Sequence, residues 1–218
     1  MRDDEVFAGL RGSTDTFVRA CARARGVMAG VLLTLGLAAA GPVAAAELQP
    51  LDPQPGAADL EAGLSVEYYQ AFFREIEDFE YWMEDNEGKA GKPLPALNYR
   101  TAGRAALTSG IADGVGAKID GLIHLAKTGT YAFTVQSNDG FVLDIGGVPL
   151  LEDTDVHGDR YSAIAKPTVP QPGWYRLSVL YFERKGTSTL QLYWRPPGEE
   201  DAGMVIVPDA AFAHLKAK

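Results

Sequence analysis

The sequence contains very little cysteine: one residue, Cys21, in a chain of 218. A single thiol cannot form an intrachain disulfide bridge, and the residues before it, Val18-Arg19-Ala20, do not form a lipoprotein signal. The sequence therefore excludes a disulfide-stapled fold and a lipid anchor on this cysteine. Stability has to come from an apolar core, for which a hydrophobic content of 46% is ample, or from a bound ion.

Positive charge is also scarce. The chain has 20 Lys and Arg residues against 29 Asp and Glu, a formal net charge of −9, and the basic residues are scattered. Binding to nucleic acid requires a basic surface, so nucleic acid is not an expected partner. Histidine is rarer still, and His124, His157 and His214 are too far apart in sequence for a zinc-binding motif.

Recognisable catalytic motifs are missing as well. The sequence has no G-x-S-x-G nucleophile elbow, no H-E-x-x-H zinc motif and no phosphate-binding G-x-x-x-x-G-K loop. Paired carboxylates that hydrolyse glycosides leave no such motif, because their separation in space does not follow from the sequence. We therefore expect a protein that is not an enzyme, with glycoside hydrolysis as the catalytic alternative left open.

The first 46 residues have the pattern of a secretory signal peptide. Arg19, Arg23 and Arg25 precede an apolar run of about 15 residues that ends at the small residues Ala44-Ala45-Ala46. Cleavage after the last of these alanines is predicted, which makes the protein secreted or periplasmic, with no stable membrane insertion. Pro42 and the weakly apolar alanines disfavour the alternative, in which the segment is retained as a membrane anchor.

The remaining chain divides into a linker, one domain and a tail. Residues 47–59 contain three prolines and few apolar anchors, which is typical of an extended linker. The folded domain is expected over residues 60–212, followed by a tail at 213–218. Between residues 66 and 85, apolar residues at helical spacing oppose an acidic face and predict a helix of about 12 residues that covers an open end of the domain. Residues 86–110, rich in glycine and small residues, are predicted to form a long loop or an insertion.

Alternating apolar and polar residues predict β-strands from residue 117 onward. The alternation is clear at Tyr131, Phe133, Val135, Phe141, Leu143 and Ile145. Gly146-Gly147 then provides a two-residue hairpin turn, and Pro149 places the following strand at a sheet edge. Residues 173–181 are largely apolar on both faces, which predicts a central strand covered on each side. The predicted fold class is all-β, an antiparallel barrel or sandwich with an N-terminal signal segment and one short covering helix.

Six short motifs occur in a characteristic order. They are Gly129-Thr130-Tyr131-Ala132-Phe133, Ser137-Asn138-Asp139-Gly140, Gly173-Trp174-Tyr175, Tyr181-Phe182-Glu183, Leu192-Tyr193-Trp194 and Val207-Pro208. Together with an opening G-L-x-x-x-Y-Y at 63–69, which would close a first strand at its two tyrosines, they make residues 60–212 resemble a PA14 domain. The resemblance implies a β-barrel or sandwich module of a kind often used to bind carbohydrate.

The turn Ser137-Asn138-Asp139-Gly140 is the first candidate site. In sugar-binding adhesins of this family, the residues aligned with Asn138 and Asp139 are aspartates joined by a cis peptide, whose oxygens hold a calcium ion. The resemblance therefore implies a Ca²⁺ site at Asn138 and Asp139 with outward-facing oxygens. Asn138 departs from the pattern, since an amide removes one formal charge and calcium affinity falls with ligand charge. The alternative is an ordinary turn in which Asp139 accepts backbone N–H bonds.

The acidic loop at 151–160 is the second candidate site. It does not form an EF-hand, because Ile164 occupies the position of the bidentate glutamate and no helix flanks the loop. Its side chains are expected either to complete an oxygen cage beside the Asn138-Asp139 turn or to accept hydrogen bonds from sugar hydroxyls. Tyr161 is expected to stack on a sugar ring, whereas the strand aromatics are expected in the core. The predicted ligand-binding residues are Asp139, Asp153, Asp155, His157, Asp159 and Tyr161. The alternative is a solvated acidic loop.

The sequence thus predicts an exported, non-catalytic carbohydrate-binding module, assisted by calcium. It would use the loop around Asn138-Asp139 and the acidic 152–159 loop, with a glycan or an envelope protein as its partner. The alternative function is a structural or protein-interaction module of the cell envelope that does not bind sugar.

Overall fold

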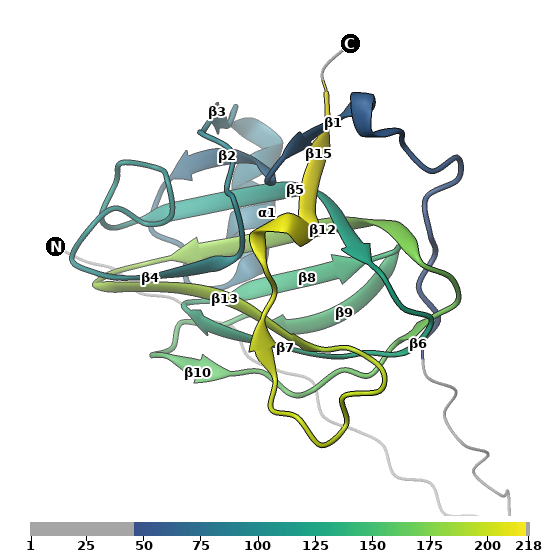
Figure 1. Cartoon of the computed structure of the whole chain (residues 1–218). Helices are drawn as coiled ribbons and strands as arrows, with labels where there is room; N and C mark the ends of the chain where they lie inside the picture. The colour runs from purple at the N-terminus through teal and green to yellow at the C-terminus, as the bar shows by residue number, and fades with distance from the viewer. Residues whose placement is uncertain (1–45, 217–218) are drawn as a thin grey trace, which may run out of the picture. The chain divides into compact units, whose positions relative to one another are not determined.

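The computed structural model describes residues 46–216, and the predicted signal segment lies outside the described residues apart from Ala46. Within this part of the chain, antiparallel strands form two main sheets and a separate two-stranded pair, with one α-helix (Figure 1). The predicted all-β fold class is confirmed. No helix within residues 46–216 has the length and apolar character needed to cross a membrane.

The larger sheet has eight strands, in the order β1-β15-β5-β12-β8-β9, with β2 attached to β5 and β3 attached to β2. They are β1 (Leu60–Ala62), β2 (Ser65–Gln70), β3 (Lys89–Ala90), β5 (Val115–Leu125), β8 (Phe141–Ile145), β9 (Val148–Asp153), β12 (Gly173–Glu183) and β15 (Phe212–Leu215). The long strands β5 and β12 pair along their whole length, from Gly173 opposite Leu125 to Glu183 opposite Val115. The hairpin predicted at Gly146-Gly147 joins β8 to β9, and β9 forms an edge of the sheet, as Pro149 indicated.

The smaller sheet has five strands, in the order β10-β7-β13-β14, with β4 also paired to β13. They are β4 (Asn98–Ala102), β7 (Ala132–Asn138), β10 (Arg160–Tyr161), β13 (Thr187–Arg195) and β14 (Val205–Ile206). The separate pair consists of β6 (Gly129–Thr130) and β11 (Thr168–Val169). Two short 3₁₀ helices span Ala57–Asp59 and Asp209–Ala211.

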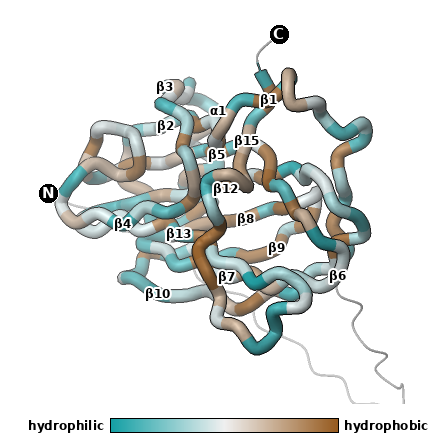
Figure 2. The backbone as a smooth tube through the Cα atoms, viewed as in Figure 1, coloured by the Kyte–Doolittle hydropathy of each residue, from teal (hydrophilic) through white to brown (hydrophobic). Residues whose placement is uncertain are grey.

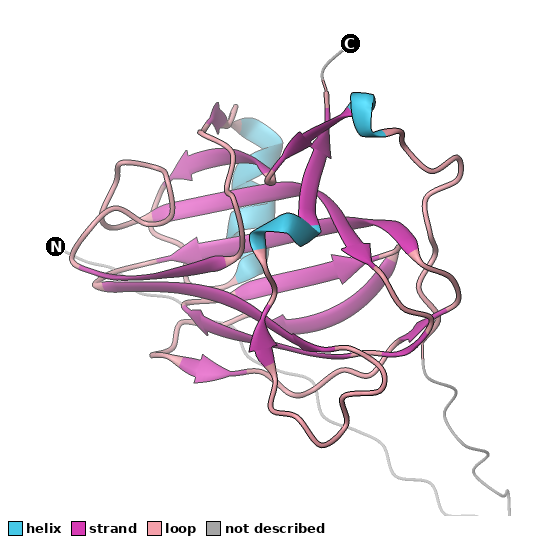
Figure 3. Cartoon of the chain, in the orientation of Figure 1, coloured by secondary structure: helices cyan, strands magenta, loops and turns pink. Residues whose placement is uncertain are grey.

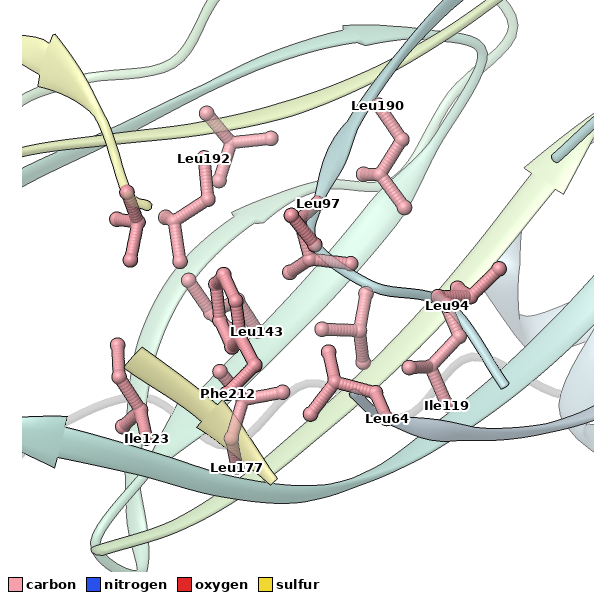
Figure 4. Packing of buried hydrophobic residues seen from close by; sticks show 14 of the residues in the cluster. Leu64, Leu94, Leu97, Ile119, Ile123, Leu143, Leu177, Leu190, Leu192 and Phe212 are labelled. Carbon is pink, nitrogen blue, oxygen red and sulfur yellow. The ribbon is translucent and has the colours of Figure 1, made fainter. Parts of the chain in front are cut away.

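The main apolar core lies between the two sheets. Period-two alternation along the strands directs one face of each sheet inward, and Figure 2 shows this as short hydrophobic and hydrophilic segments in turn. Figure 4 shows part of the core, with Leu190 and Leu192 of β13 and with Ile119 and Leu177 of the larger sheet, all of them buried in one cluster. Burial on this scale is the main stabilising contribution in a domain without disulfides.

Helix α1 (Ile76–Asp85) packs on the outer face of the larger sheet (Figure 3). Ile76 and Phe79 are buried in a second cluster with Phe182 of β12. Because side chains alternate along a strand, Phe182 points away from the main core. Gly116 of β5 permits this approach, because a Cβ atom there would lie 2.5 Å from the Phe79 ring. The helix therefore covers a sheet face and not the open end that we expected. We expected the strand at 173–181 to be covered on both faces. Only its end next to α1 is covered in this way, since Arg176 is exposed.

The segment at 47–59 is docked on the domain and is not an extended linker. Leu48 is fully buried, and its N–H donates to the carbonyl of Thr168 at 2.9 Å. The N–H groups of Gln49 and Leu51 donate to carbonyls of the β8–β9 turn and of β12, each at 2.9 Å. The prediction missed this because three prolines and one buried leucine leave little pattern to read.

Two further boundaries differ from the prediction. The expected loop at 86–110 contains β3 and β4, of which β4 pairs with β13 about 90 residues further along the chain. The expected tail at 213–218 supplies Ala213–Leu215 to β15, which pairs with β1 and β5. Both errors have one cause: short strands whose partners lie far away in sequence carry no local signal.

Candidate functional site

The turn Asn138-Asp139-Gly140 crosses from one sheet to the other, because β7 belongs to the smaller sheet and β8 to the larger. The peptide bond between Asn138 and Asp139 is cis, which the sequence alone left open. Gly140 is required by close packing: a Cβ atom would lie 2.6 Å from the Phe182 ring and 2.8 Å from the carbonyl oxygen of Thr154. The turn is therefore packed tightly against β12 and the loop that follows β9.

The side chain of Asp139 faces the interior. It is 3% exposed, and its Oδ1 accepts a hydrogen bond from the N–H of His157 at 3.0 Å, while its Oδ2 accepts one from the N–H of Arg184 at 2.7 Å. Burial raises the pKa of Asp139 above its ordinary value, and the two N–H donors oppose this shift. The interpretation of Asp139 as an acceptor of backbone N–H bonds is confirmed, and the expectation that its oxygens face outward is wrong.

Asp153 pairs with two side chains of its own loop. The guanidinium of Arg160 binds it through two nitrogens, with Nε 2.6 Å from Oδ2, and this pairing raises the pKa of Arg160. Nε2 of His157 lies 3.3 Å from the same carboxylate but lacks hydrogen-bond geometry. Nδ1 of His157 lies 2.8 Å from the carbonyl oxygen of Gly158. These contacts fold the acidic loop back on itself.

Asp159 connects the loop to the smaller sheet. Its Oδ2 lies 2.9 Å from Nε and 2.7 Å from Nη2 of Arg100 on β4, and its Oδ1 accepts a hydrogen bond from the Thr189 hydroxyl on β13 at 2.7 Å. Burial alone would raise the pKa of Asp159, but bonds from Thr189, Arg100 and Asn138 lower it below its ordinary value. Asn138, a predicted calcium ligand, thus lies beside Asp159.

Asp155 and Tyr161 point to solvent. Asp155 is exposed, and its backbone bridges to Glu75, just before α1. Tyr161 on β10 is 57% exposed, and its ring meets that of Tyr193 edge to face at 5.5 Å. Burial raises the pKa of Tyr193 to about 12.

A shallow pocket of about 350 Å³ lies beside Tyr161 on the outer face of the smaller sheet. It is lined by Thr134, Tyr161, Ser162, Ile164, Tyr193 and Met204. The Thr134 hydroxyl lies 3.1 Å from the Ser162 hydroxyl, so two hydroxyl groups meet at the base of this partly aromatic surface. The predicted site residues therefore fall into two groups, an internal network of carboxylates and an exposed aromatic pocket next to it.

Glu183, at the end of β12, is a titratable residue that the sequence interpretation missed. Its side chain is fully buried, and neither carboxylate oxygen has a hydrogen-bond partner. Burial raises its pKa to about 7, the negative charges of Asp113 and Asp139 add to the shift, and the N–H of Gly114 opposes it. The alternation of side chains along β12 could have indicated its burial, since Glu183 lies on the same inward face as Tyr181.

The donors around the turn do not fit a calcium ion as they are arranged. Both oxygens of Asp139 already accept N–H bonds, and Asn138 offers only a neutral amide oxygen. Within residues 46–216, no group of three or more His, Cys, Asp or Glu side chains is placed to hold a metal. Calcium takes roughly 6 to 8 oxygen ligands, so backbone carbonyls or water would have to supply most of them.

Comparison with known families identifies one match. Residues 107–205, from just before β5 to the start of β14, match the family model described as PA14 domain. No curated protein sequence gives a match to this chain.

Solved structures of low sequence identity share the fold. The PA14 domain of the MpAFP antifreeze protein is 20% identical, covers 75% of this chain and 95% of its own, and superposes with a TM-score of 0.58. A PA14 sugar-binding domain from an RTX adhesin is 18% identical, with 70% and 98% coverage and a TM-score of 0.55. The Epithelial Adhesin 9 A domain from Candida glabrata, solved in complex with Galb1-3GlcNAc, is 11% identical, with 78% and 96% coverage and a TM-score of 0.61. At these identities the similarity shows the fold alone.

Proposed function

We propose that this chain, whose residues 107–205 match the PA14 domain family model, is an exported carbohydrate-binding module without catalytic activity. The observation that carries the proposal is the exposed Tyr161 beside a preformed pocket, on a loop that buried carboxylates hold in place. Sugar-binding domains among the structural neighbours support the same class of ligand.

Tyr161 has the properties of a sugar-stacking residue. The C–H face of a pyranose packs on an exposed aromatic ring, and the edge contact with Tyr193 fixes the orientation of the Tyr161 ring before a ligand arrives. The hydroxyls of Thr134 and Ser162 lie at the base of the same pocket. Both hydroxyls already bond main-chain groups, so the pocket offers a neutral sugar chiefly an aromatic platform.

The acidic residues of the proposed site divide into supporting and contacting groups. Asp139, Asp153 and Asp159 bind neighbouring groups of the protein and keep the loop in one conformation, which reduces the entropic cost of binding. Asp155 is exposed and is available to accept hydrogen bonds from sugar hydroxyls. His157 takes part through its backbone N–H, which fixes the loop on Asp139.

Calcium is an auxiliary part of the proposal. The donors as they are arranged do not fit the ion, so calcium at Asn138 and Asp139 would require Asp139 to give up its bonds from the N–H groups of His157 and Arg184. The melting temperature measured with millimolar calcium and with a chelator tests this, because a ligand that binds only the folded state raises the midpoint. A rise of several degrees with calcium supports the metal, and identical curves remove calcium while leaving the Tyr161 pocket to be tested separately.

The proposed sugar site is tested by Tyr161→Ala against a panel of neutral glycans. Loss of ring stacking should weaken glycan binding about tenfold, as measured by titration calorimetry on the best ligand of a glycan array. Tyr81→Ala is the matched control, since Tyr81 on α1 is 61% exposed and lies outside the pocket. Equal affinity of the two variants would show that sugar is not bound at Tyr161.

A structural or protein-interaction module of the envelope is the second candidate function. It is favoured by the carboxylates Asp139, Asp153 and Asp159, which are already occupied by contacts within the protein. This function predicts a glycan array without signal and a specific protein captured from an envelope extract. Array signals that Tyr161→Ala removes would count against it.

A further inference from the structure

Another cavity lies away from the Tyr161 pocket. It has a volume of about 700 Å³ and is lined by residues from the end of α1, from β2 and β3, and from the loop at 108–111. Figure 1 shows where α1, β2 and β3 lie in the domain. The cavity shares no residue with the Tyr161 pocket, which lies on the smaller sheet. We call it the α1–β3 groove.

The floor of the groove is rigid. Two tyrosines of β2, Tyr68 and Tyr69, are buried there, and the Tyr68 hydroxyl lies 2.8 Å from the Thr108 hydroxyl and accepts the N–H of Thr108 at 3.0 Å. Gly88 and Gly91 let the chain close over these rings, since a Cβ atom at either position would lie 2.6 Å or less from a tyrosine ring. The groove is therefore formed before any ligand binds.

Trp82 supplies an aromatic wall. Its side chain is 42% exposed at the end of α1, and its ring meets Phe73 edge to face at 6.4 Å. Asn86 donates Nδ2 to the carbonyl of Trp82 at 2.8 Å, which directs the amide of Asn86 and leaves its oxygen available as an acceptor. An indole face beside a fixed amide is a suitable surface for the C–H and O–H groups of a sugar ring.

The charge of the groove contrasts with that of the protein. Lys89 and Lys92 line it, both are exposed, and neither forms an ion pair with any residue in 46–216. Glu87 is its only acidic lining residue. In a chain of net charge −9, two unpaired lysines beside an exposed indole indicate a ligand that carries negative charge.

We propose that the α1–β3 groove binds an acidic saccharide, a sugar that carries a carboxylate. Trp82 stacks on the ring, Lys89 and Lys92 bind the carboxylate, and the Asn86 amide accepts a hydrogen bond from a hydroxyl. This second site is independent of the Tyr161 pocket and takes a different class of sugar.

The test is calorimetric titration of the protein with a galacturonic acid trisaccharide, and with the neutral galactose trisaccharide as a matched probe. The acidic probe should bind at least tenfold more tightly than the neutral one, and salt should weaken its binding. Trp82→Ala, and separately the double variant Lys89→Gln with Lys92→Gln, should each reduce affinity about tenfold. Trp82→Phe, which keeps a stacking ring, should retain most of it.

Three controls separate this site from the rest of the protein. Tyr81→Ala and Lys166→Gln alter an exposed aromatic and an exposed lysine outside the groove and should leave affinity unchanged. Tyr161→Ala should leave acidic-sugar binding unchanged even if it removes neutral glycan binding. The proposal is overturned by undetectable binding of the acidic probe at millimolar concentration, by unchanged affinity in the lysine double variant, by loss of binding in Tyr161→Ala, or by tighter binding of a nucleoside monophosphate.

Discussion

Asp139 holds together parts of the chain that are far apart in sequence. Its two acceptor bonds join the β7–β8 turn to His157, 18 residues away, and to Arg184, 45 residues away. A carboxylate that is buried and bonded in this way is strongly stabilising relative to a variant that leaves the N–H groups without partners. The residue most suggestive of metal chemistry in the sequence is therefore also a structural anchor.

Asp139→Ala should lower the free energy of unfolding by about 3 kcal/mol, because two charge-assisted hydrogen bonds are lost. Chemical denaturation measures this change, and amide exchange should rise selectively at His157 and Arg184. The exposed Asp155, replaced by alanine, is the control and should alter stability by less than about 0.5 kcal/mol. If both variants unfold at the same denaturant concentration, Asp139 does not anchor the loops.

Glu183 should make the protein less stable as pH rises. Its pKa is raised to about 7 by burial, from an ordinary value of 4.5, so the folded state keeps a proton that the unfolded state releases. The contribution to stability is complete below about pH 4.5 and is lost as pH increases through about 7. Across this window the loss is about 3 kcal/mol.

Glu183→Gln removes this dependence. The variant should melt at a higher temperature than the parent protein at pH 8, and the difference should disappear near pH 4, where both side chains are neutral. Melting curves at a series of pH values provide the measurement. A difference that does not change with pH would mean that Glu183 is ionised in the folded protein.

The sequence revealed the turn and the loop, but not their contacts. Ser137-Asn138-Asp139-Gly140 stood out because Asn, Asp and Gly favour turns and because the motif resembles a known one. The partners of Asp139 are backbone N–H groups, which any residue supplies, so nothing at 157 or 184 indicated them. Arg100, the partner of Asp159, lies 59 residues away in a segment that we expected to be a loop.

Among the elements, α1 is held on the sheet by two buried residues, Ile76 and Phe79, of which Phe79 makes the aromatic contacts. Phe79 is fully buried between Tyr69 and Phe73, with ring centroids at 5.4 Å and 4.9 Å, whereas most other side chains of the helix are exposed. A helix of 10 residues has little stability by itself in water. Its position, and with it the wall of the α1–β3 groove, depends mainly on Phe79, the larger of its two buried side chains.

Phe79→Ala should destabilise the domain by about 3 to 5 kcal/mol, because it removes a large buried ring and leaves a cavity. Thermal unfolding measures the loss, and Tyr81→Ala on the same helix should change the midpoint only slightly. Exchange of the α1 amides should increase more than that of β12. A Phe79→Ala protein as stable as the parent would mean that the helix does not depend on this contact.

Strand prediction succeeded where burial produced alternation and failed where it did not. β7, β8 and β12 present clear two-residue periods, since one face of each lies in the core. β4 has an exposed and half-exposed pattern at the edge of the smaller sheet, and β3 contains two residues. Such strands are defined by pairing with distant partners and not by their own composition.

At the scale of the whole molecule, the segment from Glu47 to Leu51 joins parts that the sheets leave separate. Leu48 binds the strand pair β6–β11 through Thr168, and the next residues bind the larger sheet. Leu48→Ala should therefore cost about 2 to 5 kcal/mol, although the residue lies outside both main sheets. Denaturant titration measures the loss, with Gln54→Ala as a control that removes exposed side-chain bonds. No loss in Leu48→Ala would mean that this docking is incidental.

This docking also governs how the protein can be attached to other molecules. A reporter or affinity tag inserted within residues 47–51 would have to displace main-chain hydrogen bonds to three parts of the domain. Such a fusion would therefore yield misfolded protein. The cysteine-free sequence after Cys21 offers a better route. One thiol introduced at an exposed position such as Lys166, which lines neither candidate sugar surface, would allow site-specific coupling to a chip or bead.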